Sequence, residues 1–208
     1  MENTLTIKEF KALSKSDRAM LVAKDVIQQI KARRYNVRAG SYIKHIVFKG
    51  KIYYFNNGSI KNNDIKKNFE EIDSCVVCAI GSCILSTTKF ANKLKFGDVG
   101  ATTESFNSKA ITLLNTIFTP KQQLLIECCF EGYIYLASPT EFKKRREKES
   151  FEYNESSQRF AHIKSDSLKL TYDEVLSCLT FKVKYKTETT LLVGIMENII
   201  KNEGVFIP

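Results

Sequence analysis

Apolar positions recur at helical spacing near the front of the chain. Residues 14 to 36, SKSDRAMLVAKDVIQQIKARRYN, place their apolar side chains three or four positions apart, which gives a helix one apolar face. Ser14 followed by Asp17 is an arrangement that caps a helix start. Basic residues from Lys31 onward stand where the partial negative charge of a helix end favours cations. The pattern predicts an amphipathic helix over this stretch.

A different pattern follows in residues 42 to 55, YIKHIVFKGKIYYF. Two runs rich in β-branched and aromatic residues flank the pair Lys49 and Gly50. Such runs on either side of a two-residue turn indicate a β-hairpin.

The longest apolar run begins at residue 75, in the stretch DSCVVCAIGSC of residues 73 to 83. Every residue from Val76 to Leu85 is apolar or small. A helix that is apolar on all sides is a buried one. We therefore expect a buried central helix over about residues 75–90.

Capping signals mark further helices. Thr119 followed by Pro120 is typical of a helix start, and Thr171 with Glu174 has capping-box spacing. Ser138 and Pro139 precede a charged segment, and the last apolar stretch predicts a helix ending near Asn202. Residues 181 to 188 alternate like a short strand.

Together these elements predict a mainly α fold of one domain, residues 1–208, built around the helix at about 75–90 with a small hairpin at about 42–55. No run approaches the roughly 20 apolar residues of a membrane span, and the segment MENTLTIKEF is polar. We expect a cytoplasmic protein with no membrane partner, in which cysteines stay reduced.

Charge divides the chain into two parts. The net charge is +9, and residues 1–70 hold 15 lysines and arginines against 6 aspartates and glutamates, a difference of +9. Residues 71–208 hold 17 of each and are balanced. A localised excess creates a field that attracts anions, and solubility is the alternative explanation.

The cysteines allow three interpretations. Cys75 and Cys78 have the spacing of zinc-binding and redox pairs, but structural zinc needs four ligands and a second pair is missing. The negative charge of Asp73 would raise a nearby thiol pKa, which disfavours a redox role. The apolar surroundings favour a third interpretation, cysteine as a compact core residue. We expect neither metal nor cofactor.

Three segments carry a resemblance: CVVCAIGS, GIMENIIKNEGVFIP and AKDVIQQIKARRYNVRAGSYI. They are similar to a group of small uncharacterised proteins encoded in phage and bacterial genomes that share a Cys-x-x-Cys-Ala-x-Gly stretch. The resemblance covers about a quarter of the chain. It implies an association with phage genomes, hence a host cytoplasm, and supplies no catalytic residues.

No phosphate loop, nucleophile elbow or metalloprotease motif occurs in the sequence, so we expect a protein that is not an enzyme. Guanidinium groups and tyrosines concentrate between residues 32 and 45, a combination that suits a nucleotide. The alternative to ligand binding is a structural role, in which these cations cap the helix end that leads into the hairpin. The residues expected to bind are Arg33, Arg34, Arg38, Ser41, Tyr42, Lys44 and His45.

Two functions remain open from the sequence. The first is a binding protein for an anionic nucleotide-like ligand, sequestering a host immune signalling nucleotide if the chain is phage-encoded. The second is an accessory protein that binds nucleic acid or a host protein. A homodimer is the default expectation for an oligomer.

Overall fold

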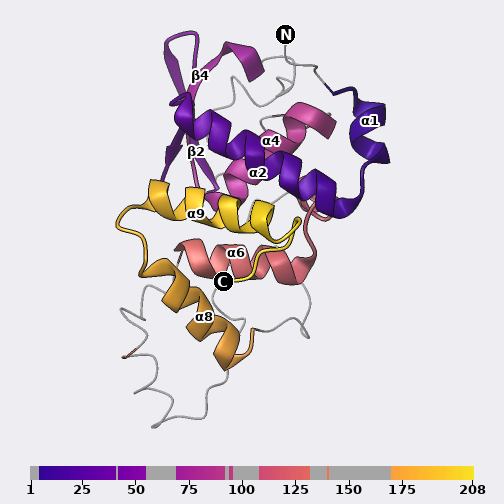
Figure 1. Ribbon diagram of the computed structural model, residues 1–208. Coiled ribbons are helices and arrows are strands. Elements are labelled where there is room, and N and C mark those ends of the chain that lie inside the picture. Colours follow the sequence, from indigo (N-terminus) through magenta and orange to yellow (C-terminus); the bar gives the residue numbers. More distant parts are fainter. Residues whose placement is uncertain are drawn as a thin grey trace.

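The fold is mixed α/β, with helices packed against a four-stranded sheet (Figure 1). The computed structural model describes residues 5–40, 42–54, 69–91, 94–95, 108–131, 140 and 170–208. The expectation of a mainly α fold is wrong, because two strands beyond the hairpin complete a sheet that lies against the central helices.

Short local signals place most element boundaries. The helices are α1 Ile7–Ala12, α2 Lys15–Lys31, α4 Ala79–Ala91, α5 Ser108–Leu114, α6 Pro120–Glu131, α8 Tyr172–Lys182 and α9 Glu188–Lys201. The strands are β1 Tyr35–Val37, β2 Ile43–Phe48, β3 Lys51–Tyr54 and β4 Ile72–Val77, and a 3-10 turn covers Phe69–Glu71. In Figure 1, the helices follow one another down the molecule in the order α2, α9, α6 and α8, and each helix contacts the next.

The capping predictions at Ser14, Pro120 and Thr171 are confirmed, and the one at Ser138 and Pro139 lies outside the described residues. The side chain of Ser14 accepts a hydrogen bond from the Asp17 amide, 3.0 Å away, and starts α2. Thr171 and Glu174 form the capping box of α8, and α6 begins at Pro120. Residues 183 to 187 form a turn between α8 and α9, so the short strand expected there is wrong.

The hairpin prediction is also confirmed. Lys49 and Gly50 have φ angles of 49° and 71°, the positive pair that a type I′ turn requires. The turn fixes the register, so that Phe48 lies opposite Lys51 and His45 lies opposite Tyr54.

Residues 75 to 77, predicted as the start of the central helix, belong instead to a strand over residues 72 to 77. This strand, β4, pairs parallel with β1 and antiparallel with β2, so it lies inside the sheet. The helix α4 begins only at Ala79 and is buried from there to Thr88. An apolar run fits a buried strand as well as a buried helix, and pairing with two neighbours makes its first part a strand.

All six cysteines are free and buried, which confirms the core interpretation. Cys75 faces the core from β4, and Cys78 lies between β4 and α4. Within the described part of the chain, no helix combines the length and the apolar character that a bilayer-crossing segment needs.

The buried cysteines predict a loss of stability in alkali. Burial raises the pKa of the Cys83 thiol to about 12 and lifts that of Cys75 further still, whereas a thiol in an unfolded chain has a pKa of about 8.5. A group whose pKa is higher in the folded protein than in the unfolded chain stabilises the fold. This stability is complete at pH values below the pKa of the unfolded chain and is lost as the pH rises toward the pKa of the folded protein.

We therefore expect the free energy of unfolding, measured by urea denaturation, to fall steadily from about pH 9 upward. Thiol-reagent kinetics at pH 8 provide the control, since the buried thiols should react slowly in the native protein and fast in urea. Stability that stays constant up to pH 10 would contradict the burial of these thiols.

Candidate functional site

The strand β1 brings two of the expected arginines onto one face of the sheet. The carbonyl of Arg34 accepts a hydrogen bond from the Cys75 amide (2.7 Å), and the Arg38 amide donates to the Val77 carbonyl (2.9 Å). The ladder between β1 and β4 thus continues one residue beyond each end of β1. Because strand residues alternate between faces, Arg34, Asn36 and Arg38 share the face opposite the buried side chains of β1.

The register extends this face across all four strands. Asn36 lies opposite Val76, which lies opposite His45, which in turn lies opposite Tyr54. A second row holds Ser74, Val47 and Ile52. We define the outer face as the following set of described residues: Arg34, Asn36, Arg38, Ser74, Val76, His45, Val47, Ile52 and Tyr54.

The outer face is half-buried in its middle, on β4 and β2, and more exposed toward its two edges, and its chemistry is mixed. Tyr54 is 49% exposed and Ile52 is 56% exposed, and Asn36 and Arg38 are exposed as well. The rings of His45 and Tyr54 lie 5.6 Å apart between centroids, tilted by 58°. None of its nine positions carries a carboxylate. The face can stack against a planar group, donate hydrogen bonds and attract a negative charge.

Lys44 lies beside the outer face, at one end of the sheet. The register between β2 and β4 shifts between Ile43 and His45, so Lys44 is the extra residue of a bulge, a feature that re-aims side chains. Val37 and Ile43 both lie opposite Val77. The exposed side chains of Arg38, one residue beyond β1, and Lys44, on β2, therefore belong to the same end of the sheet.

Tyr42 does not belong to this surface. Its ring is buried, and its hydroxyl donates a hydrogen bond to Glu127 Oε1 on α6, 2.9 Å away. Burial and the neighbouring Glu127 carboxylate raise the pKa of Tyr42 far above its ordinary value. A phenol held in this way anchors the segment between β1 and β2 and is not available to stack on a ligand.

Carboxylates also hold the backbone of that segment. The Gly40 amide donates to Glu131 Oε2 (2.7 Å), and the Ala39 amide donates to Glu188 Oε1 (3.2 Å). Together with Glu127, these groups make the side of the segment that faces α6 and α9 acidic. An anion would be repelled there, so the arginines can serve a ligand only from the outer face.

The remaining expected residues separate. Arg33 is exposed just beyond α2, with a φ of 60°, one position before the alternation of β1 begins. Ser41 lies outside the described residues. His45 lies in the middle of the outer face, and its Nδ1 is enclosed with no hydrogen-bond partner among the described residues.

Six residues of the face were missed by sequence reasoning: Asn36, Ser74, Tyr54 and the apolar Val47, Ile52 and Val76. Tyr54 could have been found, because a two-residue turn at Lys49 and Gly50 pairs it directly with His45. Asn36 and Ser74 gave no signal, since their placement depends on the pairing of β1 and β2 with β4.

A metal centre has no support in this region. Among the described residues, no three histidine, cysteine, aspartate or glutamate side chains gather closely enough to hold a metal ion. Comparisons of the chain with protein-family models, with curated proteins and with solved structures find no match.

Proposed function

We propose that the protein binds an anionic, nucleotide-like ligand on the outer face of its sheet. The observation that carries this proposal is the row Asn36, Val76, His45 and Tyr54, which runs across four strands beside Arg34 and Arg38. The row and the two arginines together combine ring faces, an amide and two guanidinium groups, with no carboxylate among them.

Each group suits one part of a nucleotide. Exposed tyrosine and histidine rings stack on unpaired bases. Guanidinium groups bind phosphate oxygens through paired hydrogen bonds, and the lysine ammonium acts as a point charge. The Asn36 amide and the Ser74 hydroxyl supply both donors and acceptors for base edges or ribose.

The charge distribution supports the same ligand class. Three of the four strands, β1, β2 and β3, lie in the basic first 70 residues, whose excess charge of +9 equals that of the whole chain. A surface with an excess of one sign raises the local concentration of oppositely charged ligands.

The proposed role is binding without turnover. His45 is the residue of the outer face best suited to general base catalysis, and among the described residues no partner orients its Nδ1, whereas a catalytic base is usually held by a third group. Sequestration of a signalling nucleotide in a host cytoplasm is a role of this kind.

Two variants test the placement of the site. Tyr54→Ala should weaken nucleotide binding by about 1–3 kcal/mol, roughly 5- to 150-fold in Kd, because it removes a stacking ring. Arg38→Ala should weaken oligonucleotide binding and reduce the slope of log K against log salt by about one phosphate contact. The measurement is isothermal titration of nucleoside phosphates and short mixed-sequence oligonucleotides at several salt concentrations.

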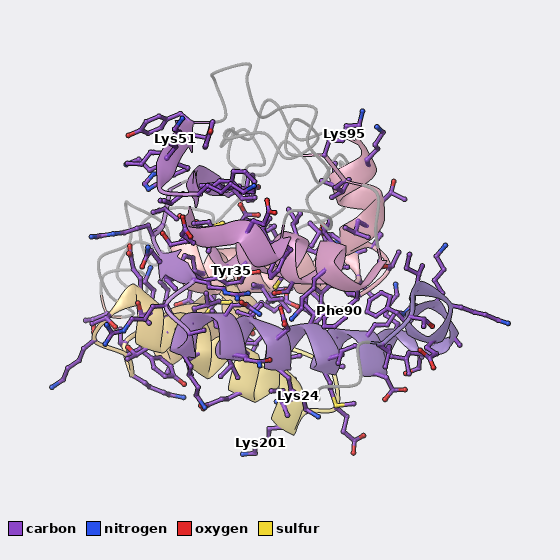
Figure 2. All side chains as sticks on the ribbon, turned by 90° about the horizontal axis from the view of Figure 1, so that it is seen from above. Lys24, Tyr35, Lys51, Phe90, Lys95 and Lys201 are labelled. Carbon is purple, nitrogen blue, oxygen red and sulfur yellow. The ribbon has the colours of Figure 1, made fainter. Side chains whose placement is uncertain are left out.

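Lys24→Ala is the matched control. Lys24 is exposed on α2 beside α9, whereas Lys51 marks the hairpin on the other side of α4 (Figure 2). The control removes one positive charge without touching the outer face, so its binding should match that of the parent. Equal weakening of oligonucleotide binding by Lys24→Ala and Arg38→Ala would mean a diffuse charge effect and would reject the outer face as the site. A steep salt dependence with tighter binding of longer oligonucleotides would favour the alternative, a nucleic-acid-binding protein.

A further inference from the structure

The outer face is wider than one nucleotide. Neighbouring strands lie about 4.8 Å apart, and Asn36 and Tyr54 occupy the two edge strands of a four-stranded sheet. Three spacings separate them, so the row from Asn36 to Tyr54 is roughly 14 Å long. A single nucleotide has one base, joined through one ribose to its own phosphate. With its phosphate at the end of the sheet, its base therefore covers one half of the row and leaves the other half empty.

The two halves of the row each offer a surface for one base. On β2 and β3, the exposed ring of Tyr54 offers a face for stacking, and the His45 ring lies beside it, tilted by 58°. On β4 and β1, the half-buried Val76 provides an apolar surface, and the exposed Asn36 beside it has an amide that can bond to a base edge. The centres of the two surfaces are about two strand spacings, or roughly 10 Å, apart.

The cations repeat the same spacing. Arg38 follows β1, and Lys44 lies near the start of β2, both at the end of the sheet where Val37 and Ile43 meet Val77. Because β4 separates β1 from β2, the two cations are also about two strand spacings apart. Each half of the row thus has one base surface and one cation at the same end of the sheet.

We infer that the ligand unit is two linked nucleotides lying across the strands. This inference rests on the proposed function and specifies its ligand. One base stacks on Tyr54 beside the ring of His45, the other packs on Val76 and bonds to Asn36, and the phosphates lie at the end of the sheet on its outer-face side, beside Lys44 and Arg38. The bases must be unpaired, because in a duplex their faces are covered by neighbouring bases. The unit is either a free dinucleotide or two residues of a longer single strand.

A length series tests the inference. The probes are a nucleoside 5′-monophosphate, the 5′-phosphorylated dinucleotide and the corresponding tetra- and octanucleotides of the same base, titrated into the full chain at fixed salt. We expect the dinucleotide to bind at least tenfold more tightly than the monophosphate. An affinity that levels off at the dinucleotide indicates a free dinucleotide as the ligand. A continued rise with length indicates a single strand, and both outcomes support a two-nucleotide unit.

Variants in the β1 half separate this inference from the proposed function. Asn36→Ala and Arg38→Ala should weaken dinucleotide binding at least fivefold and leave monophosphate binding within twofold, whereas Tyr54→Ala should weaken both. Both β1 residues are exposed, so circular dichroism should confirm an intact fold. Equal affinity for both probes, with Tyr54→Ala weakening each, would overturn the two-nucleotide unit and retain the proposed site. Affinities unaffected by Tyr54→Ala and Arg38→Ala would overturn both.

Discussion

Replacing Gly81 by alanine is expected to destabilise the protein by more than about 3 kcal/mol, above the usual range for overpacking, or to prevent folding. A Cβ atom at this position would lie 1.7 Å from the Tyr42 carbonyl oxygen and 2.5 Å from its carbonyl carbon. The obstacle is backbone, and that backbone is fixed by the Cys78 amide, which donates to the same oxygen. Alanine normally stabilises a helix by about 1 kcal/mol over glycine. A large loss of stability would therefore come from the contact between the added Cβ and the Tyr42 backbone.

Gly194→Ala is the matched control for this prediction. Gly194 also lies inside a buried helix, α9, and an added Cβ there would meet the ring of Tyr185 at 2.2 Å. That ring belongs to a half-buried side chain, which can rotate away. Urea denaturation of both variants compares the two positions. Equal stability of Gly81→Ala and Gly194→Ala would show that α4 does not pack directly on the segment between β1 and β2.

The second large effect is expected at a buried ion pair between α2 and α4. Asp25 is 4% exposed, and its Oδ1 accepts hydrogen bonds from Lys89 Nζ (2.8 Å) and Gln29 Nε2 (3.1 Å). Its Oδ2 has no hydrogen-bond partner among the described residues. The Lys89 ammonium therefore provides the charge that compensates the buried carboxylate. Tyr35 and Phe90, labelled in Figure 2, lie in the layer between α2 and α4.

Lys89→Met should destabilise the protein by about 3–5 kcal/mol, because it leaves a buried charge without its partner. Replacing both residues, as in Asp25→Leu with Lys89→Met, should recover most of that loss, since apolar replacement of a buried pair is often neutral. The four proteins of this double-mutant cycle are compared by urea denaturation.

Lys121→Met gives the matched comparison at a more exposed pair. Lys121 Nζ lies 2.6 Å from Glu174 Oε2, and their side chains are 35% and 32% exposed. Solvent screening limits such a pair to about 1 kcal/mol or less. Similar losses for Lys89→Met and Lys121→Met would mean that Asp25 is solvated in the folded protein.

The sequence by itself determined the local elements. The caps at Ser14, Thr119 and Thr171 act within one helical turn, and the turn at Lys49 and Gly50 acts within four residues. The burial of the cysteines also follows from their apolar neighbours. These features depend on interactions between residues close in the chain, which is why a pattern of residue types predicts them.

The candidate site was only partly predictable. Arg34, Arg38, Lys44 and His45 were selected from the basic segment, and the structure places them on or beside one face of the sheet. Tyr42 was selected for an exposed ring, but Glu127, 85 positions later, accepts its hydroxyl hydrogen bond in the interior. No local pattern distinguishes a tyrosine with a distant buried acceptor from one that faces solvent.

Only the tertiary structure decided the fold class. The apolar residues Cys75 to Val77 suit a buried helix or a buried strand equally well. They form a strand because Tyr35 to Val37 on one side and Ile43 to Phe48 on the other satisfy their backbone hydrogen bonds. The same pairing aligns Asn36, Val76, His45 and Tyr54 into the row on which the proposed function rests. Partners between 24 and 40 residues away along the chain settle both choices. Backbone hydrogen bonds between such distant residues cannot be read from the local order of apolar and polar residues.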